Sequence, residues 1–454
     1  MSKLSKDFTQ GSIPLQLLLF SAPLFLSSLL QVVYNMADMI IVGQYCGTVG
    51  LAAVTVGGDL SSFATFMSMG FSNAGQVMIS QFLGAKQSRK LGTFIATMCV
   101  FLLGLSLCIS GLALFFLDPI LQLMHTPAES YSATHSYTLI TLCGLPFIYG
   151  YNMVSAILRG IGDSNHPFIF IAIASVLNII LDLVFIAHFH LGPASAAMAT
   201  VISQCISFIA CAIFLLRHKE ELGIAFTWSQ FLHLDREMFV DYLRLGVPMA
   251  IKNASVHSSK LFVNSWINSF GVTVAAVAGI ANKFSSIGNL FSNSVNTAAS
   301  SMVGQNIGAE KYERVPRIIG NTFAFAVVVT TCLSLAVYYY PEPIFGIFTD
   351  DPSLMPVCLE YVPYALLMFL GTAVRAPFNA LVNGSGNYIV NFLVALLDGF
   401  VMRIGASALF GIFLNWGYHG FWLGDAIAGF TPLWIGGIFL LSGKWKTNKY
   451  IIKG

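Results

Sequence analysis

Residues 13–43 read IPLQLLLFSAPLFLSSLLQVVYNMADMIIVG, an apolar run too long for an ordinary core helix of a soluble protein. The run contains one charged side chain, Asp38. A carboxylate in the middle of a membrane-spanning helix costs about 2.5–3.5 kcal/mol on insertion scales. Such a residue usually faces a bundle interior or a wet cavity and has a function there. The stretch therefore predicts a membrane-spanning helix with a functional acid.

The composition of the whole chain agrees with this interpretation. Of 454 residues, 56% are hydrophobic and only 9% are charged, and the mean hydropathy is +0.77. Because a backbone exposed to lipid must satisfy its own hydrogen bonds, we expect helices. Hydropathy predicts an all-α integral membrane protein with twelve transmembrane helices. They cover about residues 13–43, 50–80, 92–117, 132–158, 166–190, 192–217, 240–270, 272–305, 316–340, 356–382, 387–414 and 417–441.

The basic residues predict the orientation. Every Lys and Arg outside the predicted spans falls in the termini or in the even-numbered loops, and the odd-numbered loops carry only acids. Because Lys and Arg are enriched in cytoplasmic loops, both termini are predicted to be cytoplasmic. We expect a multi-pass protein of the cell membrane.

A repeat divides the chain into two halves. Met78-x-x-Gln81-x-x-Gly84-Ala85 recurs as Met302-x-x-Gln305-x-x-Gly308-Ala309, and Gly160-x-Gly162 recurs as Gly384-x-Gly386, both at an offset of 224 residues. The most polar connection, residues 218–239, lies between the halves. We therefore predict an N-terminal six-helix lobe (1–217), a cytoplasmic linker (218–239) and a C-terminal six-helix lobe (240–454).

The charges inside the spans differ between the halves. The first half holds acids alone, and such an uncompensated cluster attracts a proton or a metal cation. The second half holds mostly bases, which either neutralise its two acids in ion pairs or receive a carboxylate or phosphate of a substrate. The first group is Asp38, Asp59 and Asp182; the second is Lys252, Lys260, Lys283, Arg375 and Arg403, with Asp398 and Asp425.

Depth brings four residues of the first half together. Asp38, Asp182 and Thr200 each lie eight or nine residues from the outer end of their spans, which is about 12–14 Å along a helix. Asn178 is four residues before Asp182 and shares its helical face. An all-oxygen set of this kind suits Na⁺, and two close carboxylates can instead share a proton. The sequence leaves both alternatives open.

The sequence carries no catalytic constellation, so we do not expect an enzyme. It contains no GxxxxGK[ST] motif, so we expect no ATP hydrolysis by this chain. We expect a small-molecule substrate, no cofactor other than the coupling ion, no nucleic acid and a monomer in the lipid bilayer. The predicted substrate-binding residues are Tyr34, Asn35, Met67, Asn152, Met153, Lys260 and Arg403.

These motifs resemble the MATE (multidrug and toxic compound extrusion) transporters over almost the whole length of the chain. The resemblance rests on five stretches taken together. They are Tyr34-Asn35-Met36-Ala37-Asp38 with Ile41-Val42-Gly43-Gln44, Arg159-Gly160-Ile161-Gly162-Asp163, Asn178-Ile179-Ile180-Leu181-Asp182, Ala199-Thr200-Val201-Ile202-Ser203-Gln204, and Val303-Gly304-Gln305-Asn306-Ile307-Gly308-Ala309.

The resemblance implies two pseudo-symmetric six-helix bundles around a central cleft. It also implies export of organic, cationic drugs or toxic compounds driven by a Na⁺ or H⁺ gradient. Asp38, Asn178, Asp182 and Thr200 match the cation site of DinF-like members. NorM-like members have an acid in the seventh span, where this chain has Lys252, His257 and Lys260. The alternative is a flippase or exporter of a lipid-linked or anionic metabolite that uses the basic C-lobe pocket.

Overall fold

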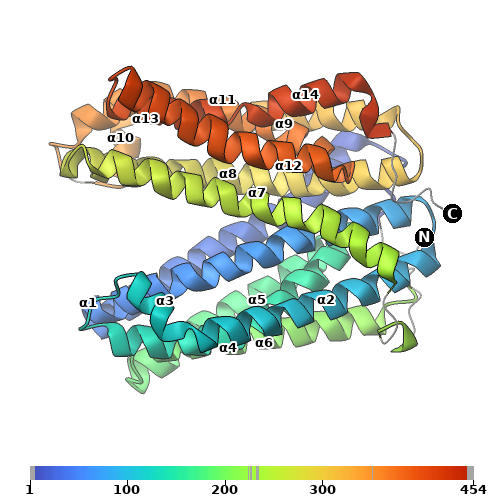
Figure 1. The fold of residues 1–454 in the computed structure, drawn as a ribbon, viewed down its shortest axis with the longest axis horizontal. Helices are drawn as coiled ribbons and strands as arrows, with labels where there is room; N and C mark the ends of the chain where they lie inside the picture. The colour runs from blue at the N-terminus through green and yellow to red at the C-terminus, as the bar shows by residue number, and fades with distance from the viewer. Residues whose placement is uncertain (1–5, 223, 225–227, 232–234, 350, 447–454) are drawn as a thin grey trace. The chain divides into compact units, whose positions relative to one another are not determined.

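The computed structural model describes residues 6–222, 224, 228–231, 235–349 and 351–446, which are almost entirely helical (Figure 1). The twelve predicted spans all form helices, and no strand occurs within the described ranges. The prediction of an all-α fold is therefore confirmed. Lys3, Lys449 and Lys453, which contributed to the predicted orientation, and part of the predicted linker lie outside these ranges.

The first two predicted spans form one element, α1 (Ile13–Gly84), which breaks at Gly47. Gly47 has φ 64° and ψ −157°, a conformation that residues with a side chain rarely adopt, so the helix changes direction there. The other spans are α2 (Ser88–Phe115), α4 (Tyr131–Gly160), α5 (Asn165–Asp182) with η1 (Leu183–His188), α6 (Ala194–Arg217), α7 (Arg236–Asn268), α8 (Val272–Gly308), α9 (Arg314–Tyr339), α11 (Met355–Gly384), α12 (Tyr388–Leu396) with η3 (Leu397–Ala406) and η4 (Leu409–Phe413), and α13 (Tyr418–Ala428) with α14 (Thr431–Ser442).

Three short helices lie between these spans, α3 (Leu117–Leu123), η2 (Trp228–Phe231) and α10 (Pro341–Gly346), and η5 (Lys444–Lys446) follows the last span. By length and composition, nine helical segments of the described chain are apolar enough to cross a membrane, with the broken α1 counted once. The more polar α7 and α8 are not among the nine. Large apolar side chains such as Phe115 and Leu441 are exposed on these helices, as contact with lipid tails would require.

Contacts divide the chain into two compact units. Unit 1 holds Ala22–Gly246 with the residues up to Asp7, and unit 2 holds Phe8–Ser21 and Val247–Gly454. The predicted lobes, 1–217 and 240–454, differ from this division at both ends: residues 8–21 group with unit 2 and residues 240–246 with unit 1. Helices α1 and α7 therefore each contain residues of both units. In each helix the second residue after the change of unit is a proline, Pro23 in α1 and Pro248 in α7.

Residues 8–21 belong to unit 2 because the repeated motif of α8 binds their backbone. The backbone N–H of Phe8 donates to Gln305 Oε1 at 3.0 Å, and Asn306 Nδ2 donates to the Phe8 carbonyl at 3.0 Å. Lys311 Nζ donates to the Thr9 carbonyl at 2.9 Å. The Phe8 side chain is fully buried. The motif thus has a structural task, to fix the start of α1 in unit 2.

Close helix packing in unit 1 places α6 against α4. A Cβ atom on Gly144 of α4 would lie 2.3 Å from Val201 Cγ2 of α6, and one on Gly150 would lie 2.6 Å from the Phe208 ring. These two glycines let the helices approach closely, and α5 packs on another side of α6. The helix that carries Thr200 is thereby held next to the helix that carries Asn178 and Asp182.

We predict that Asn306→Leu loosens the start of α1. The substitution removes the donor to the Phe8 carbonyl and leaves buried backbone groups without this partner, which costs about 1–3 kcal/mol. Hydrogen–deuterium exchange of residues 8–21 should become faster, and thermal unfolding in detergent should shift downward. Ser286→Ala is the control, because Ser286 Oγ donates to the Asn282 carbonyl of its own helix, twenty positions before Asn306. Unchanged exchange of residues 8–21 in Asn306→Leu would contradict this role.

Candidate functional site

Two carboxylates of unit 1 face each other. Asp38 on α1 is 8% exposed, and Asp182 at the end of α5 is fully buried. Their carboxyl groups lie close enough to interact directly. None of the ion pairs found among the described residues involves either acid. Like charges at this separation in a dry interior repel, so the pair needs a positive charge between or on its oxygens.

Asn178 and Thr200 lie beside the acids. Asn178 Nδ2 donates to Thr200 Oγ1 at 3.3 Å, which links α5 to α6. Asn178 is buried and lies one helical turn before Asp182. The structure therefore brings together the four residues that depth had grouped. Their role as ligands stays a prediction.

The oxygens of this group lack hydrogen-bond donors. Within the part of the chain that the structure describes, Asp38 Oδ1, Asn178 Oδ1, Gln204 Oε1 and both carboxylate oxygens of Asp182 are buried without a partner. Buried polar atoms almost always have a partner, and each one without a partner costs about 1–3 kcal/mol. Five such oxygens in one place fit a small hard cation or a shared proton.

The helix geometry changes next to Asp182. Helix α5 ends at Asp182 and continues as the π-helical segment η1, which reaches His188. A π-helical turn leaves some backbone groups out of the regular pattern and often marks a functional position in a helix. The wider turn begins directly after the acid, so the carboxyl end of α5 is a place where the helix can change its winding.

Gln204 and Tyr137, to which the sequence analysis gave no role, also lie at this site. The Tyr34 hydroxyl faces both Asp38 and Gln204, and the ring of Tyr137 on α4 lies within electrostatic range of both acids. Gln204 is four residues after Thr200 on α6, so helical spacing could have found it. Tyr137 gave no such signal, because α4 contains no acid. Buried apolar side chains, including Ile41, Val42, Val54, Ile186, Ala196 and Ala197, pack around Tyr137.

Among the described residues, no hydrogen bond or ion pair joins the other predicted substrate residues of unit 1. Asn35 is exposed on α1, while Met67 and Asn152 are half-buried. Met153 is buried in the core of unit 1 and has almost no free surface in this conformation. Of these residues, Tyr34 has the clearest connection to the acid pair. A substrate role of the others stays a prediction.

The predicted charges of unit 2 form an ion-pair chain. Arg375 Nη2 lies 3.1 Å from an oxygen of Asp398, and Arg403 Nη2 lies 3.1 Å from the other oxygen of Asp398. Arg403 also donates through Nη1 to Asp425 Oδ1. Two arginines and two aspartates thus cancel, which is the neutralising alternative of the sequence analysis. Lys260 lies near Asp425 and is half-buried.

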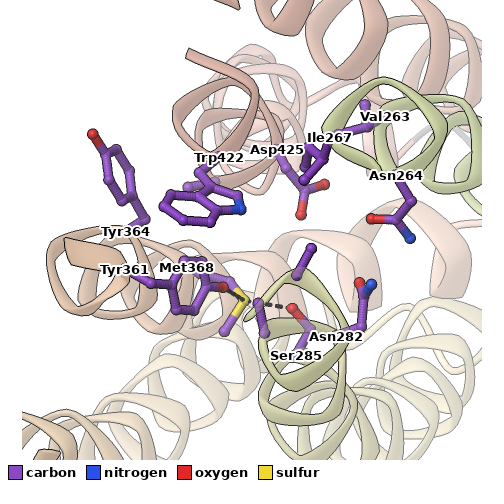
Figure 2. A pocket seen from close by; sticks show the side chains of 13 residues that line it. Val263, Asn264, Ile267, Asn282, Ser285, Tyr361, Tyr364, Met368, Trp422 and Asp425 are labelled. Atoms are coloured by element: carbon purple, nitrogen blue, oxygen red, sulfur yellow. Dashed lines mark hydrogen bonds between the residues drawn. The ribbon is translucent and has the colours of Figure 1, made fainter. Parts of the chain in front are cut away.

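Asp425 also lines a pocket of unit 2, which Figure 2 shows from close by. Ser285 Oγ donates to the sulfur of Met368 at 2.7 Å, and the Tyr361 hydroxyl donates to the same sulfur at 3.8 Å. The carboxylate of Asp425 lies across the pocket from these groups. The rest of the lining includes Val263, Asn264, Ile267, Asn282, Tyr364 and Trp422.

Comparison with known proteins identifies a protein family that matches the chain. The family model described as MatE matches residues 23–184 and, a second time, residues 248–409. The probable multidrug resistance protein YpnP of Bacillus subtilis is 28% identical over 443 residues, which cover 98% of either chain. The probable multidrug resistance protein YoeA of the same organism is 31% identical over 356 residues, which cover 77% of this chain and 75% of the relative.

Solved structures share the fold. An outward-facing multidrug resistance MATE family transporter of the MOP superfamily aligns with a TM-score of 0.90 at 22% identity, covering 98% of this chain and 99% of the other. A MOP superfamily transporter from Pyrococcus furiosus aligns with a TM-score of 0.88 at 22% identity, covering 98% and 100%. The architecture of the described helices is therefore one that experimental structures contain.

We predict that Asp182→Asn stabilises unit 1 at alkaline pH in Na⁺-free buffer. The substitution removes one of two facing buried charges, which should raise the free energy of unfolding by about 1–3 kcal/mol. The gain should shrink as the pH falls, because a proton then relieves the repulsion in the wild-type chain. Unfolding in detergent at several pH values measures it.

The control is Asp118→Asn, because Asp118 is an exposed acid of α3 that accepts a hydrogen bond from Tyr131. Its contacts with Tyr131 and His135 lie at the surface, so its removal should change stability little at alkaline pH. A less stable Asp182→Asn chain at alkaline pH would mean that the acid pair has a compensating partner.

Proposed function

Because the chain belongs to the MatE family, we propose that it is a secondary active exporter of organic drugs or toxic compounds. It would work as an antiporter in which inward flow of Na⁺ or H⁺ drives the export. Relatives named as multidrug resistance or multidrug export proteins support the exported class. Members of this family are transporters, so we assign no enzymatic reaction. The observation that carries the proposal is the pair of buried, facing, uncompensated carboxylates in unit 1.

Asp38 and Asp182 are the proposed binding groups for the coupling ion, with Asn178 and Thr200 as neutral ligands or hydrogen-bond partners. A Na⁺ ion would find carboxylate, amide and hydroxyl oxygens there, the ligand type that hard cations prefer. A proton would instead be shared between the two carboxyl groups. Both ions satisfy the orphaned oxygens, so either can drive the same step.

We place this site with the DinF-like members and not with the NorM-like members. The acids lie in unit 1, on α1 and α5. In unit 2, α7 carries Lys252 and Lys260, and α11 carries Arg375. The two lysines would repel a cation and Arg375 is already paired with Asp398, whereas the acids of unit 1 attract a cation.

The proposed mechanism uses the change of charge at Asp38. When the acid pair is charged, repulsion favours a conformation in which water or a cationic substrate reaches the carboxylates. When the pair takes up the coupling ion, α1 and α5 can approach, and α1 can bend near Pro23, where the helix lacks a backbone hydrogen bond. A cationic substrate that competes for the same charge is then released outward. The ion shifts this equilibrium only by its different affinity for the two conformations.

The ion pairs of unit 2 reduce the support for the anionic alternative, because they leave only the three lysines Lys252, Lys260 and Lys283 outside the ion pairs found among the described residues. Arg375 and Arg403, two of its five basic residues within the spans, are neutralised by Asp398 and Asp425. Lys252 Nζ donates to Asn379 Oδ1 at 2.6 Å and so has a neutral partner. We therefore retain the organic, cationic substrate. We also propose that the protein acts as a monomer in the cell membrane with both termini in the cytoplasm.

Transport by purified protein in liposomes tests the proposal. Efflux of a cationic dye such as ethidium should follow an imposed Na⁺ gradient or an imposed pH gradient, and the two are applied separately. Asp38→Asn should lower gradient-driven efflux by about 5–150-fold, because it removes the coupling charge. Asp118→Asn should transport like the wild type. Full transport by Asp38→Asn under both gradients would remove Asp38 from the mechanism.

A further inference from the structure

The two halves of the chain correspond residue by residue in their later helices. The family model matches the chain twice, and both the first and the last matched residues of the two matches are 225 positions apart. Gly192 and Gly417 are also 225 positions apart, and both have a positive φ. Gly192 (φ 80°) lies two residues before α6, and Gly417 (φ 60°) lies one residue before α13. At this offset the residues of α5 have counterparts in α12, in η3 and at position 407, and the residues of α6 have counterparts in α13, in α14 and between them.

One contact occurs in both halves. In unit 1, Asn178 of α5 donates to Thr200 of α6, and the two residues are 22 positions apart. In unit 2, Arg403 of η3 donates to Asp425 of α13, and these are also 22 positions apart. Asn178 and Arg403 are counterparts, and so are Thr200 and Asp425. The same link is thus neutral in unit 1 and ionic in unit 2.

The acids of unit 1 have no acidic counterparts. Asp182 corresponds to Ser407, which is fully buried. Asp38 corresponds to Val263 when the offset of Pro23 and Pro248 is used, and to Phe262 when the offset of 224 residues is used. At the offset of 225 residues, the counterpart of Asp38 lines the same pocket as Asp425, the counterpart of Thr200 (Figure 2).

We propose that Arg403, at the position of Asn178, is a tethered cation that permanently occupies the part of unit 2 that corresponds to the ion site of unit 1. The consequence is that the protein binds its coupling ion in unit 1 alone. This inference rests on the proposed function and deepens it, because it sets the number of coupling sites. Only 3% of the Arg403 side chain is exposed, and its guanidinium contacts Asp398 and Asp425 at once.

A guanidinium is suited to this role. It stays protonated at any physiological pH and offers several N–H donors in a fixed plane, which can satisfy two carboxylates together. It cannot dissociate, because it is part of the chain. The charge that an external ion supplies to Asp38 and Asp182 is thus supplied to Asp398 and Asp425 by a side chain.

Removal of Arg403 distinguishes a tethered cation from ordinary helix packing. Without it, Asp398 keeps Arg375 as its partner, and the half-buried Asp425 keeps only Lys260 close by. When Lys260 is removed as well, Asp425 has lost both of these cations, and a largely buried charge without its partner is destabilising. An external cation or proton can then bind and restore stability, whereas lost packing would not be repaired by an ion.

The experiment uses the full-length chain purified in detergent, with the unit 1 site disabled by Asp38→Asn. The melting temperature is measured while Na⁺ is titrated at fixed pH and, separately, while the pH is lowered without Na⁺. The wild type should be stabilised by one of these ions, and Asp38→Asn should lose the effect. Asp38→Asn with Arg403→Ala and Lys260→Ala should regain a concentration-dependent rise of the melting temperature. Asp38→Asn with Arg403→Lys and Lys260→Ala should not, because a cation remains at position 403.

A folded Asp38→Asn, Arg403→Ala, Lys260→Ala chain whose melting temperature changes with neither ion would overturn the proposal. If that chain does not fold, direct counting of bound ions decides, with radioactive Na⁺ and with proton uptake. The proposal requires that Asp38→Asn leaves no binding site. A site that survives Asp38→Asn and disappears when Asp425→Asn is added would overturn it. Failure of the proposed function has another signature, a wild-type chain that responds to neither ion.

Discussion

The high free energy of a charge inside an apolar helix bundle is the constraint on which this structure depends. Each unit buries carboxylates, and each must supply them with positive charge. Unit 2 does so with its own arginines, in the chain Arg375–Asp398–Arg403–Asp425. Unit 1 has no such partner for Asp38 and Asp182 among the described residues. We therefore expect its stability to depend on charge supplied from outside, which would make its conformation sensitive to an ion.

The course of α1 shows how this sensitivity can reach the rest of the chain. The helix begins among residues of unit 2, where Gln305 and Asn306 bind the Phe8 backbone, and continues into unit 1, where it carries Asp38. Pro23 follows the change of unit by two residues and removes one backbone hydrogen bond. A covalent and mostly hydrogen-bonded rod thus connects the acid site to unit 2 through one weak point. Bending at that point is less costly than bending elsewhere in the helix.

Apolar runs predicted the spans closely because lipid imposes length and hydrophobicity on each helix separately. Depth along each helix grouped Asp38 with Asp182, since equal depth needs no knowledge of tertiary contacts. Other features depend on contacts between distant residues. The place of Phe8 in unit 2 depends on α8, some 300 positions away. The proximity of Tyr137 depends on how α4 is rotated. Whether Arg403 binds a substrate or pairs with an internal acid depends on which carboxylates lie within its reach. Composition alone left that question open.

The two units thus use one scaffold with opposite solutions to the same electrostatic problem. An ion gradient can drive transport only if the ion binds and is released in each cycle. The affinity of its site must therefore differ between the two conformations. A guanidinium on the chain never leaves, so a unit that it fills contributes rigidity and no coupling. With one exchangeable site, each cycle gains the free energy of one ion. For a tenfold concentration gradient this is about 1.4 kcal/mol, and each 100 mV of membrane potential adds about 2.3 kcal/mol. The accumulation ratio that such an exporter can sustain is limited accordingly, and a second free acid pair would raise this limit only by removing the ion pairs that hold unit 2 together.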